Sequence, residues 1–199
     1  MKYRLVEIFA SLQGEGRNSG RQCVFVRLAG CNLKCPWCDT DIAPRFSISL
    51  EELLSEIESL RHKSVVLTGG EPTMAEGMAE LVAALKERGY WIAVETNATC
   101  GFDDAPWLEF VDYIAASPKA ELGTVPIKLD RADEVRVVAS MPKTVDFCRK
   151  VRKMIVATDY YVSPCDRGGA IDWAAAKDAL KELGDWSLSV QLHKILGFR

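Results

Sequence analysis

The sequence predicts an α/β fold, a partial and open barrel of parallel strands with fewer helices. Short apolar runs bounded by turn residues recur along the chain, and amphipathic helical patterns lie between several of them. Strands that alternate with helices favour a parallel sheet built from βαβ units. The chain offers about six strands and four helices, which is fewer than the eight pairs of a complete barrel. A partial barrel therefore fits this pattern better than a closed one.

Each predicted strand is a short run dominated by apolar residues, as expected for a buried strand. The runs are Cys23–Leu28, Val65–Thr68, Trp91–Thr96, Tyr113–Ser117, Glu134–Ala139 and Tyr160–Ser163.

Four segments carry helical patterns, and residues that start or stop helices lie at their ends. Apolar residues spaced three and four apart between Leu53 and Leu60 form one stripe, with Ser49 in position to cap the N-terminus. Glycine, which suits the left-handed conformation that ends many helices, follows two of the segments. The predicted helices are Leu50–Arg61, Ala75–Arg88 before Gly89, Lys143–Met154, and Ala170–Leu183 before Gly184.

The composition predicts one compact domain over residues 1–199. The 199 residues are 48% hydrophobic and 27% charged, so the chain can bury a sizeable core. A formal net charge of −3 gives no electrostatic reason to expect nucleic acid or an anionic membrane as a partner. The N-terminus lacks the apolar core of a secretory signal, and no run of about 18 apolar residues could span a bilayer. We therefore expect a cytoplasmic protein.

Polar and turn residues collect where the predicted strands end. The carboxyl ends of parallel strands share one rim, and chemistry collects there in α/β proteins. This convergence favours an enzyme. The stretches are Arg27–Cys31, Thr68–Glu71, Glu95–Asn97, Ser117–Lys119 and Ser163–Pro164.

Three of the seven cysteines lie close together, at Cys31, Cys35 and Cys38. An odd number of clustered cysteines in a reducing cytosol indicates metal binding or catalysis rather than a disulfide scaffold. Thiolates at this spacing can point at one centre, and they are preferred ligands of iron–sulfur clusters and of zinc. Three cysteines would leave one iron of a [4Fe–4S] cluster open, as in a reactive metal site.

Other interpretations of these cysteines stay open on the residues alone. A structural zinc site would need a fourth ligand, which Cys23 or Cys100 could supply. A thioredoxin-like redox pair would use Cys35 and Cys38 but would leave Cys31 unexplained. An electron-transfer ferredoxin would normally carry a fourth cysteine in the motif.

A glycine-rich turn, Gly69–Pro72, follows the second predicted strand. Taken alone, it fits a strand-to-helix turn with a proline at the helix start. Together, the cysteine motif and this turn resemble the radical S-adenosylmethionine (SAM) superfamily in order and in position. The resemblance implies an incomplete TIM-like barrel of the radical SAM type, a single radical SAM domain, one [4Fe–4S] cluster on the three cysteines, and SAM as a cofactor.

Further segments resemble one family in that superfamily, the 7-carboxy-7-deazaguanine synthases, and they run along essentially the whole chain. They are Glu7–Gly16, Cys38–Thr40, Thr68–Pro72, Glu95–Asn97, Ser117–Lys119 and Gln191–Lys194. The resemblance implies a lyase that converts 6-carboxy-5,6,7,8-tetrahydropterin to 7-carboxy-7-deazaguanine with loss of ammonia, an early step toward queuosine. It also implies Mg²⁺, a homodimer, and an external one-electron reductant such as a flavodoxin.

The same resemblance assigns a set of residues to SAM. Backbone groups at Gly69 and Gly70 would approach the SAM amino group closely because glycine has no side chain, and Trp37 would lie beside the adenine. Ser163 departs from the glutamine expected in many relatives. The full set is Trp37, Cys38, Asp39, Gly70, Ser117, Pro118, Lys119, Ser163, Pro164, Cys165 and Asp166.

A second set is implied to hold the substrate and Mg²⁺. Thr40 resembles the Mg²⁺ ligand, and Glu95 and His193 resemble a catalytic carboxylate and a substrate-side histidine. The residues that resemble substrate contacts are Leu12, Gln13, Gly14, Arg27, Thr68 and the terminal Arg199.

Arg27 is also singled out by its own surroundings, since it follows the apolar run Val24–Val26 near a strand end. A buried, unpaired cation is strongly destabilising, so Arg27 should meet an anion. A bidentate pair with the substrate's carboxylate would suit it. The alternative is an internal ion pair with Glu7 or Glu95.

Two other functions stay open at this stage. A glycyl-radical-enzyme activase shares the superfamily motif, the small size and the incomplete barrel, but its partner would be a large protein. The loop Gln13–Gly16 and Arg27 favour a small anionic substrate instead. A zinc-binding module without catalysis would hold one zinc ion in place of iron and sulfide.

Overall fold

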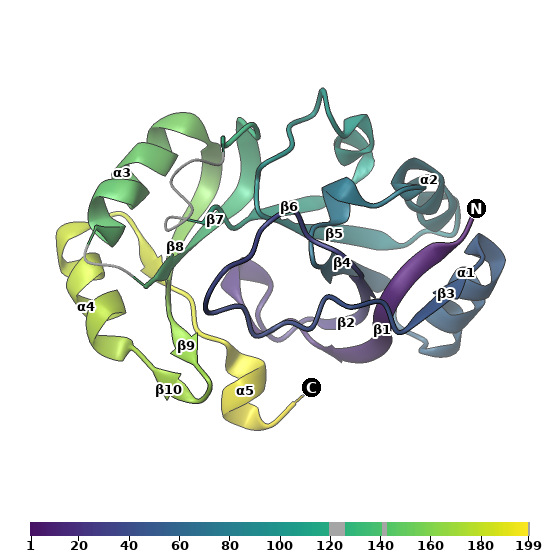
Figure 1. Cartoon of the computed structure of the whole chain (residues 1–199), viewed down its shortest axis with the longest axis horizontal. Coiled ribbons are helices and arrows are strands. Elements are labelled where there is room, and N and C mark those ends of the chain that lie inside the picture. Colours follow the sequence, from purple (N-terminus) through teal and green to yellow (C-terminus); the bar gives the residue numbers. More distant parts are fainter. Residues whose placement is uncertain (120–125, 141–142, 199) are drawn as a thin grey trace.

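The computed structural model describes residues 1–119, 126–140 and 143–198. Nine strands form one sheet in the order β11-β8-β7-β6-β5-β4-β2-β1-β3. Helices α1 and α2 pack near one end of this sheet, and α3 and α4 pack near the other (Figure 1). The sheet has two edges, β11 and β3, and does not close. The partial α/β barrel predicted from the sequence is therefore confirmed.

All six predicted strands are confirmed as the parallel centre of the sheet. Two of them begin earlier than predicted, because the pairing of β7 with β8 starts at Arg131 and Val156 and runs through polar residues that carry no apolar pattern. The strands are β2 (Gln22–Leu28), β4 (Ser64–Gly69), β5 (Trp91–Thr96), β6 (Tyr113–Ala116), β7 (Arg131–Ala139) and β8 (Val156–Pro164).

The remaining strands were not predicted. β1 (Tyr3–Leu12) pairs antiparallel with β2 and with β3 (Phe46–Ile48), and its register shifts near its start. β11 (Ser187–Leu188) adds a short parallel edge to β8, and β9 (Asp166–Arg167) forms a hairpin with β10 (Ala170–Ile171). Strands of two or three residues are too short to show a period, and polar residues interrupt the alternation of β1.

Helices α1 (Leu50–Ser59) and α3 (Thr144–Met154) confirm two predictions closely. Ser49 caps α1 as predicted. Its hydroxyl accepts the Glu52 N–H at 3.3 Å, and the Glu52 carboxylate accepts the Ser49 N–H at 2.7 Å. This reciprocal capping box satisfies two backbone donors at the helix start.

Helices α2 (Met78–Glu87) and α4 (Trp173–Glu182) begin later than predicted. Ahead of α2, Pro72–Met74 forms a separate 3₁₀ turn, η2, and Gly77 takes the left-handed conformation with φ at 76°. Ahead of α4, the chain is still in strand β10, and the Asp172 side chain caps the helix.

Three short helical segments were not predicted: η1 (Gly16–Asn18), η3 (Pro106–Phe110) and α5 (Leu192–Leu196). In Figure 1, α5 lies near the hairpin of β9 and β10. None of the helices in the described part of the chain has the length and apolar character needed to cross a membrane.

Alternate residues of the parallel strands face two different cores. On β2, Val24 and Val26 belong to the large core that includes the helices, whereas Phe25 belongs to a smaller one inside the barrel. Side chains two positions apart on a strand face the same side. A residue two positions beyond an inner-core residue therefore faces the same interior, closer to the carboxyl end of its strand. The inner core comprises Phe9, Cys23, Phe25, Val66, Ala93, Tyr113 and Ala115.

Candidate active site

A cavity of about 740 Å³ opens at the carboxyl ends of the parallel strands. Arg27, Thr68 and Glu95 line it from β2, β4 and β5, each two positions beyond an inner-core residue. Arg136 on β7 and Ser163 on β8 also line it. The strand ends thus converge on one cavity, as the sequence predicts.

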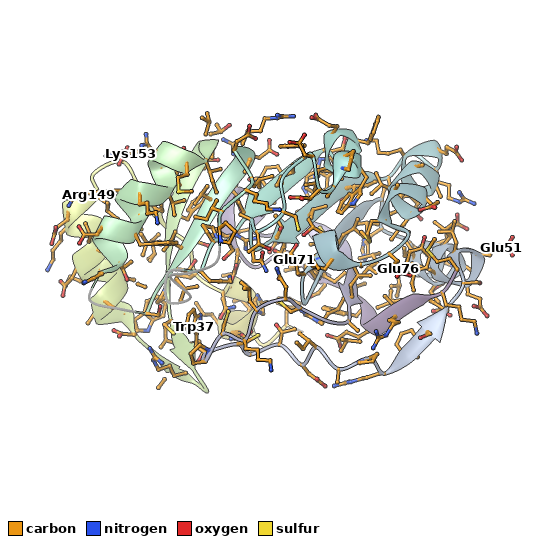
Figure 2. All side chains as sticks on the ribbon, turned by 45° about the horizontal axis from the view of Figure 1, so that its top comes forward. Trp37, Glu51, Glu71, Glu76, Arg149 and Lys153 are labelled. Atoms are coloured by element: carbon orange, nitrogen blue, oxygen red, sulfur yellow. The ribbon has the colours of Figure 1, made fainter. Side chains whose placement is uncertain are left out.

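The cysteine loop, residues 30–45, contributes much of the lining of this cavity. Cys31, Cys35 and Cys38 line it, and none of them is in a disulfide. The Leu33 N–H donates to the Sγ of Cys31 at 3.4 Å, and burial raises the pKa of that thiol. Trp37, labelled in Figure 2, lines the cavity from the same loop.

The donor set suits an iron–sulfur cluster, because three thiols outside any disulfide lie on one loop beside a cavity. In a [4Fe–4S] cluster each thiolate binds a different iron, so the ligands are spread over a volume rather than gathered at one point. Among the residues that the structure describes, no three Cys, His, Asp or Glu side chains gather as the ligands of a single metal ion would.

The glycine-rich turn after β4 packs against the end of β2. The Gly70 N–H donates to the Leu28 carbonyl at 3.0 Å, and the Glu71 N–H donates to the Gly30 carbonyl at 2.9 Å. A Cβ at Gly70 would lie 1.7 Å from the Gly30 carbonyl oxygen. The contact between two backbone segments therefore requires glycine here, in addition to any approach to SAM.

We expect Gly70→Ala to lower the free energy of unfolding by about 3 kcal/mol, because the Gly30 carbonyl cannot move away without losing its hydrogen bond to Glu71. Urea unfolding measures the loss. Gly184→Ala is the matched control, since a Cβ there meets nothing within 4 Å. Equal stability of the two variants would show that the turn has room for a side chain.

Glu71 joins the ends of β4 and β5, a role that the sequence did not indicate. It is 1% exposed and is labelled in Figure 2. Its carboxylate accepts the hydroxyls of Thr73 and Thr96, each at 2.7 Å, and the Asn97 N–H at 2.6 Å. The Asn97 side chain donates in turn to Asn32 at 2.9 Å. The strand ends are thereby tied to the cysteine loop.

Arg27 forms an ion pair in the cavity wall. Its Nε donates to the Glu7 carboxylate at 2.8 Å, across the antiparallel pairing of β1 with β2. The internal ion pair that the sequence left open is therefore present. The Arg27 side chain is still 22% exposed and lines the cavity. A guanidinium carries five N–H donors, so a ligand can share it with Glu7.

Glu95 lies within a shell of hydrogen-bond donors. The Thr68 hydroxyl donates to its Oε2 at 2.7 Å, and Gln13 Nε2 and Arg136 Nη2 donate to its Oε1 at 3.1 and 2.9 Å. Burial raises the pKa of Glu95, but the charge and hydrogen bond of Arg136, together with the hydrogen bonds from Thr68 and Gln13, outweigh burial and hold the pKa at about 2. Sequence analysis missed Arg136, although an arginine in an apolar run is the signal that singled out Arg27.

The C-terminal helix α5 covers one side of the cavity. The Leu192 N–H donates to the Gly14 carbonyl at 2.9 Å. His193 packs on Gly14, where a Cβ would lie 2.1 Å from the His193 Nδ1. Lys194, which sequence analysis also missed, bridges Asp39 at 2.6 Å and Asp166 at 2.7 Å. The cysteine loop is thus joined to β9 through α5.

Most of the predicted site residues line this one cavity. They are Leu12, Gln13, Gly14, Arg27, Cys31, Cys35, Trp37, Cys38, Asp39, Thr40, Thr68, Gly70, Glu95, Ser117, Lys119, Ser163, Pro164, Asp166 and His193. Pro118 and Cys165 are buried and lie outside this lining. Arg199 lies outside the described residues.

Two of the polar residues in the lining have partners close by in the chain. The Thr40 hydroxyl donates to the Asp39 carboxylate at 3.3 Å. The Lys119 Nζ donates to the Ser117 hydroxyl at 2.7 Å, and burial lowers the pKa of this lysine.

An open parallel barrel, a three-cysteine loop and a glycine-rich turn around one cavity define the radical SAM class of enzymes. The family model described as Radical SAM superfamily matches residues 25–163. The crystal structure of QueE from Escherichia coli shares the fold, with a TM-score of 0.76 over 97% of this chain and 95% of that chain, at 24% identity.

Curated relatives identify one family within this class. The 7-carboxy-7-deazaguanine synthases of Neisseria meningitidis and Haemophilus influenzae are 39% and 38% identical over 98% of this chain, and the matches cover 94% and 93% of their own lengths. That of Bacteroides thetaiotaomicron is 33% identical over the full length of both chains. The chain belongs to the family of 7-carboxy-7-deazaguanine synthases. It is accordingly an enzyme that uses a [4Fe–4S] cluster and SAM, and the activase and zinc-module interpretations have no support among these relatives.

Proposed function

We propose that this chain converts 6-carboxy-5,6,7,8-tetrahydropterin to 7-carboxy-7-deazaguanine with loss of ammonia, on the way to queuosine. The proposal depends on one observation: a three-cysteine loop and a wall that carries Arg27 and Glu95 share a single cavity. This arrangement suits a radical reaction on a small substrate with an anion at one end and hydrogen-bond donors at the other. Residues 1–199 act as one radical SAM domain, in keeping with a continuous core from Tyr3 to Trp186.

Cys31, Cys35 and Cys38 would hold the cluster, and SAM would bind beside it in the same cavity. When bound, the cluster and SAM supply the one-electron chemistry that removes a hydrogen atom from C6 of the pterin. The Leu33 N–H on the Cys31 sulfur stabilises negative charge there, which is one way in which a protein sets a cluster's reduction potential.

Residues near the cysteine loop hold SAM and Mg²⁺. Trp37 offers an aromatic surface to the adenine, and Gly70, Ser117, Lys119 and their neighbours in the lining complete the SAM side of the cavity. Thr40 supplies a hydroxyl to Mg²⁺. One protein ligand suffices where water and substrate oxygens fill the remaining positions of the ion.

The polar wall orients the substrate. Arg27 binds its carboxylate, and Glu95 accepts the N–H donors of its amino-pyrimidinone edge, with Thr68 and Gln13 alongside. A carboxylate with a pKa of about 2 is a weak base at neutral pH, so hydrogen bonding is favoured over proton transfer for Glu95. His193 contacts the substrate side from its position on Gly14.

The chain works as a cytoplasmic homodimer with an external one-electron donor such as a flavodoxin. Cys38 is exposed, which leaves an approach to the cluster for a reductant. None of the described cysteines is in a disulfide, as expected in a reducing compartment.

Thermal unfolding with added pterins tests the substrate class. In the presence of SAM, 6-carboxy-5,6,7,8-tetrahydropterin should raise the Tm, because a ligand at one hundred times its Kd stabilises the native state by about 2.7 kcal/mol. Tetrahydropterin without the carboxylate should raise the Tm much less, since it has no anion for Arg27. An equal rise in Tm with both pterins would show that Arg27 does not bind the carboxylate. No rise with either pterin would contradict the proposed substrate.

A further inference from the structure

One buried arginine organises the acidic side of the cavity. Arg136 lies on β7, and its side chain is 4% exposed. Its guanidinium pairs with Glu95 on β5 at 2.9 Å, with Glu134 on β7 at 3.0 Å, and with Glu15 in the segment after β1. These four residues are called the Arg136 cluster below. Three carboxylates meet one guanidinium in it, so the arginine is what permits them to be buried together.

The three carboxylates have different surroundings. Glu134 is 2% exposed and also accepts the Tyr113 hydroxyl at 2.8 Å and the Arg17 N–H at 2.9 Å, so its contacts fix the loop after β1. Glu95 is 25% exposed and lines the cavity, with one oxygen shared by Arg136 and Gln13. Arg136 thus connects an interior structural anion to the anion that faces the substrate.

We propose that Arg136 is a positioning residue for the reaction: it holds Glu95 as an oriented anion against the donor edge of the pterin and holds the Gln13–Glu15 segment in register through Glu15. The inference rests on the proposed function, because it assigns the group that prepares Glu95 for that substrate. The geometry supports it, since Arg136 is the cation whose contacts reach both Glu95 and the segment after β1.

Removal of Arg136 changes which protonation state of Glu95 is stable. Burial alone raises the pKa of a carboxyl group, and at Glu95 the guanidinium is the main group that opposes this effect, with smaller contributions from Thr68 and Gln13. Without the guanidinium, the pKa of Glu95 rises, and the anion is present only above the new pKa. Within the cluster, Glu15 and Glu134 are the other titratable groups. Lys119, Tyr113, Tyr161 and Arg17 are titratable or charged groups that face the cluster from outside it.

The test is the pH dependence of kcat/KM in Arg136→Met. In the wild type, Glu95 stays ionised across the accessible range and contributes no acid limb. In Arg136→Met, kcat/KM should fall at acidic pH, by about tenfold for each pH unit below the raised pKa of Glu95. Arg136→Lys restores a charge and should show a smaller decline. Arg131→Met is the matched control, since Arg131 is 52% exposed on the same strand and pairs with Glu109 at the surface.

A second variant, Glu95→Gln, tests whether the fall of kcat/KM at acidic pH comes from Glu95. Glu95→Gln cannot titrate there, so Glu95→Gln combined with Arg136→Met should be slow but should show no new acid limb. A fall of kcat/KM at acidic pH that persists in this double variant would overturn the proposal. A loss of kcat/KM in Arg136→Met that is equal at every pH would also overturn it.

SAM cleavage without pterin measures, in each variant, whether the SAM side of the cavity is intact. If Arg136→Met does not fold, a flat pH profile of kcat/KM in Arg136→Lys with wild-type activity would also overturn the proposal. Lack of product from the wild type would instead reject the proposed function itself.

Discussion

Replacement of Cys35 by alanine is expected to abolish product formation, with a loss of at least about a thousandfold in turnover. Cys35 is one of three cysteines on the cysteine loop, and the described residues provide no fourth thiol in the lining of the cavity to replace it. Two thiolates hold a [4Fe–4S] cluster weakly, so the variant should lose iron and sulfide and, with them, the brown colour of the cluster. Iron analysis and the visible spectrum of anaerobically reconstituted protein measure this loss directly.

Cys100→Ala provides the control for that experiment. Cys100 is a partly exposed thiol outside the cavity lining, with Met74 as its neighbour at 3.8 Å. This variant should keep its iron, its spectrum and its rate. A Cys35→Ala protein with a full complement of iron and measurable turnover would show that the cysteine loop does not hold the cluster.

Arg27→Met should reduce kcat/KM for 6-carboxy-5,6,7,8-tetrahydropterin by about a hundredfold to a thousandfold. Loss of one partner of a desolvated charge pair costs about 2–5 kcal/mol, and each 1.4 kcal/mol is tenfold. Glu7, left without its 2.8 Å partner, would add repulsion toward the substrate's carboxylate. Steady-state kinetics with varied pterin, in the presence of SAM and reductant, measure the change in kcat/KM. The rate of SAM cleavage without pterin should stay near that of the wild type.

Glu7→Gln separates the two contributions. It removes the anion that shares Arg27 but leaves the guanidinium in the cavity wall. We expect this variant to bind the carboxylated pterin at least as tightly as the wild type. A fall as large as that of Arg27→Met would mean that the ion pair serves the fold rather than the substrate.

Local patterns were sufficient to predict the centre of the fold. Strands such as Trp91–Thr96 are apolar runs with turn residues beyond them, so their period and their ends are both visible in the sequence. The same strand ends carry Thr68 and Glu95, and parallel pairing brings them to one rim without further information. The antiparallel β1 and the short α5 lack such a period, and only tertiary contacts define them.

The contacts that fix the site could not be predicted because they join residues far apart in the chain. Glu95 meets Arg136 41 residues later, and Lys194 meets Asp39 155 residues earlier. No pattern within one segment indicates which carboxylate a buried cation selects. Pro118 and Cys165 lie outside the strands, where no alternation indicates which side a residue faces.

The most direct test of the central claim is an anaerobic assay of the reconstituted wild-type protein with SAM, reductant, Mg²⁺ and 6-carboxy-5,6,7,8-tetrahydropterin, with the product identified by mass. The expected products are 7-carboxy-7-deazaguanine and one equivalent of ammonia. SAM cleavage without conversion of the pterin would keep the superfamily chemistry but contradict the proposed substrate.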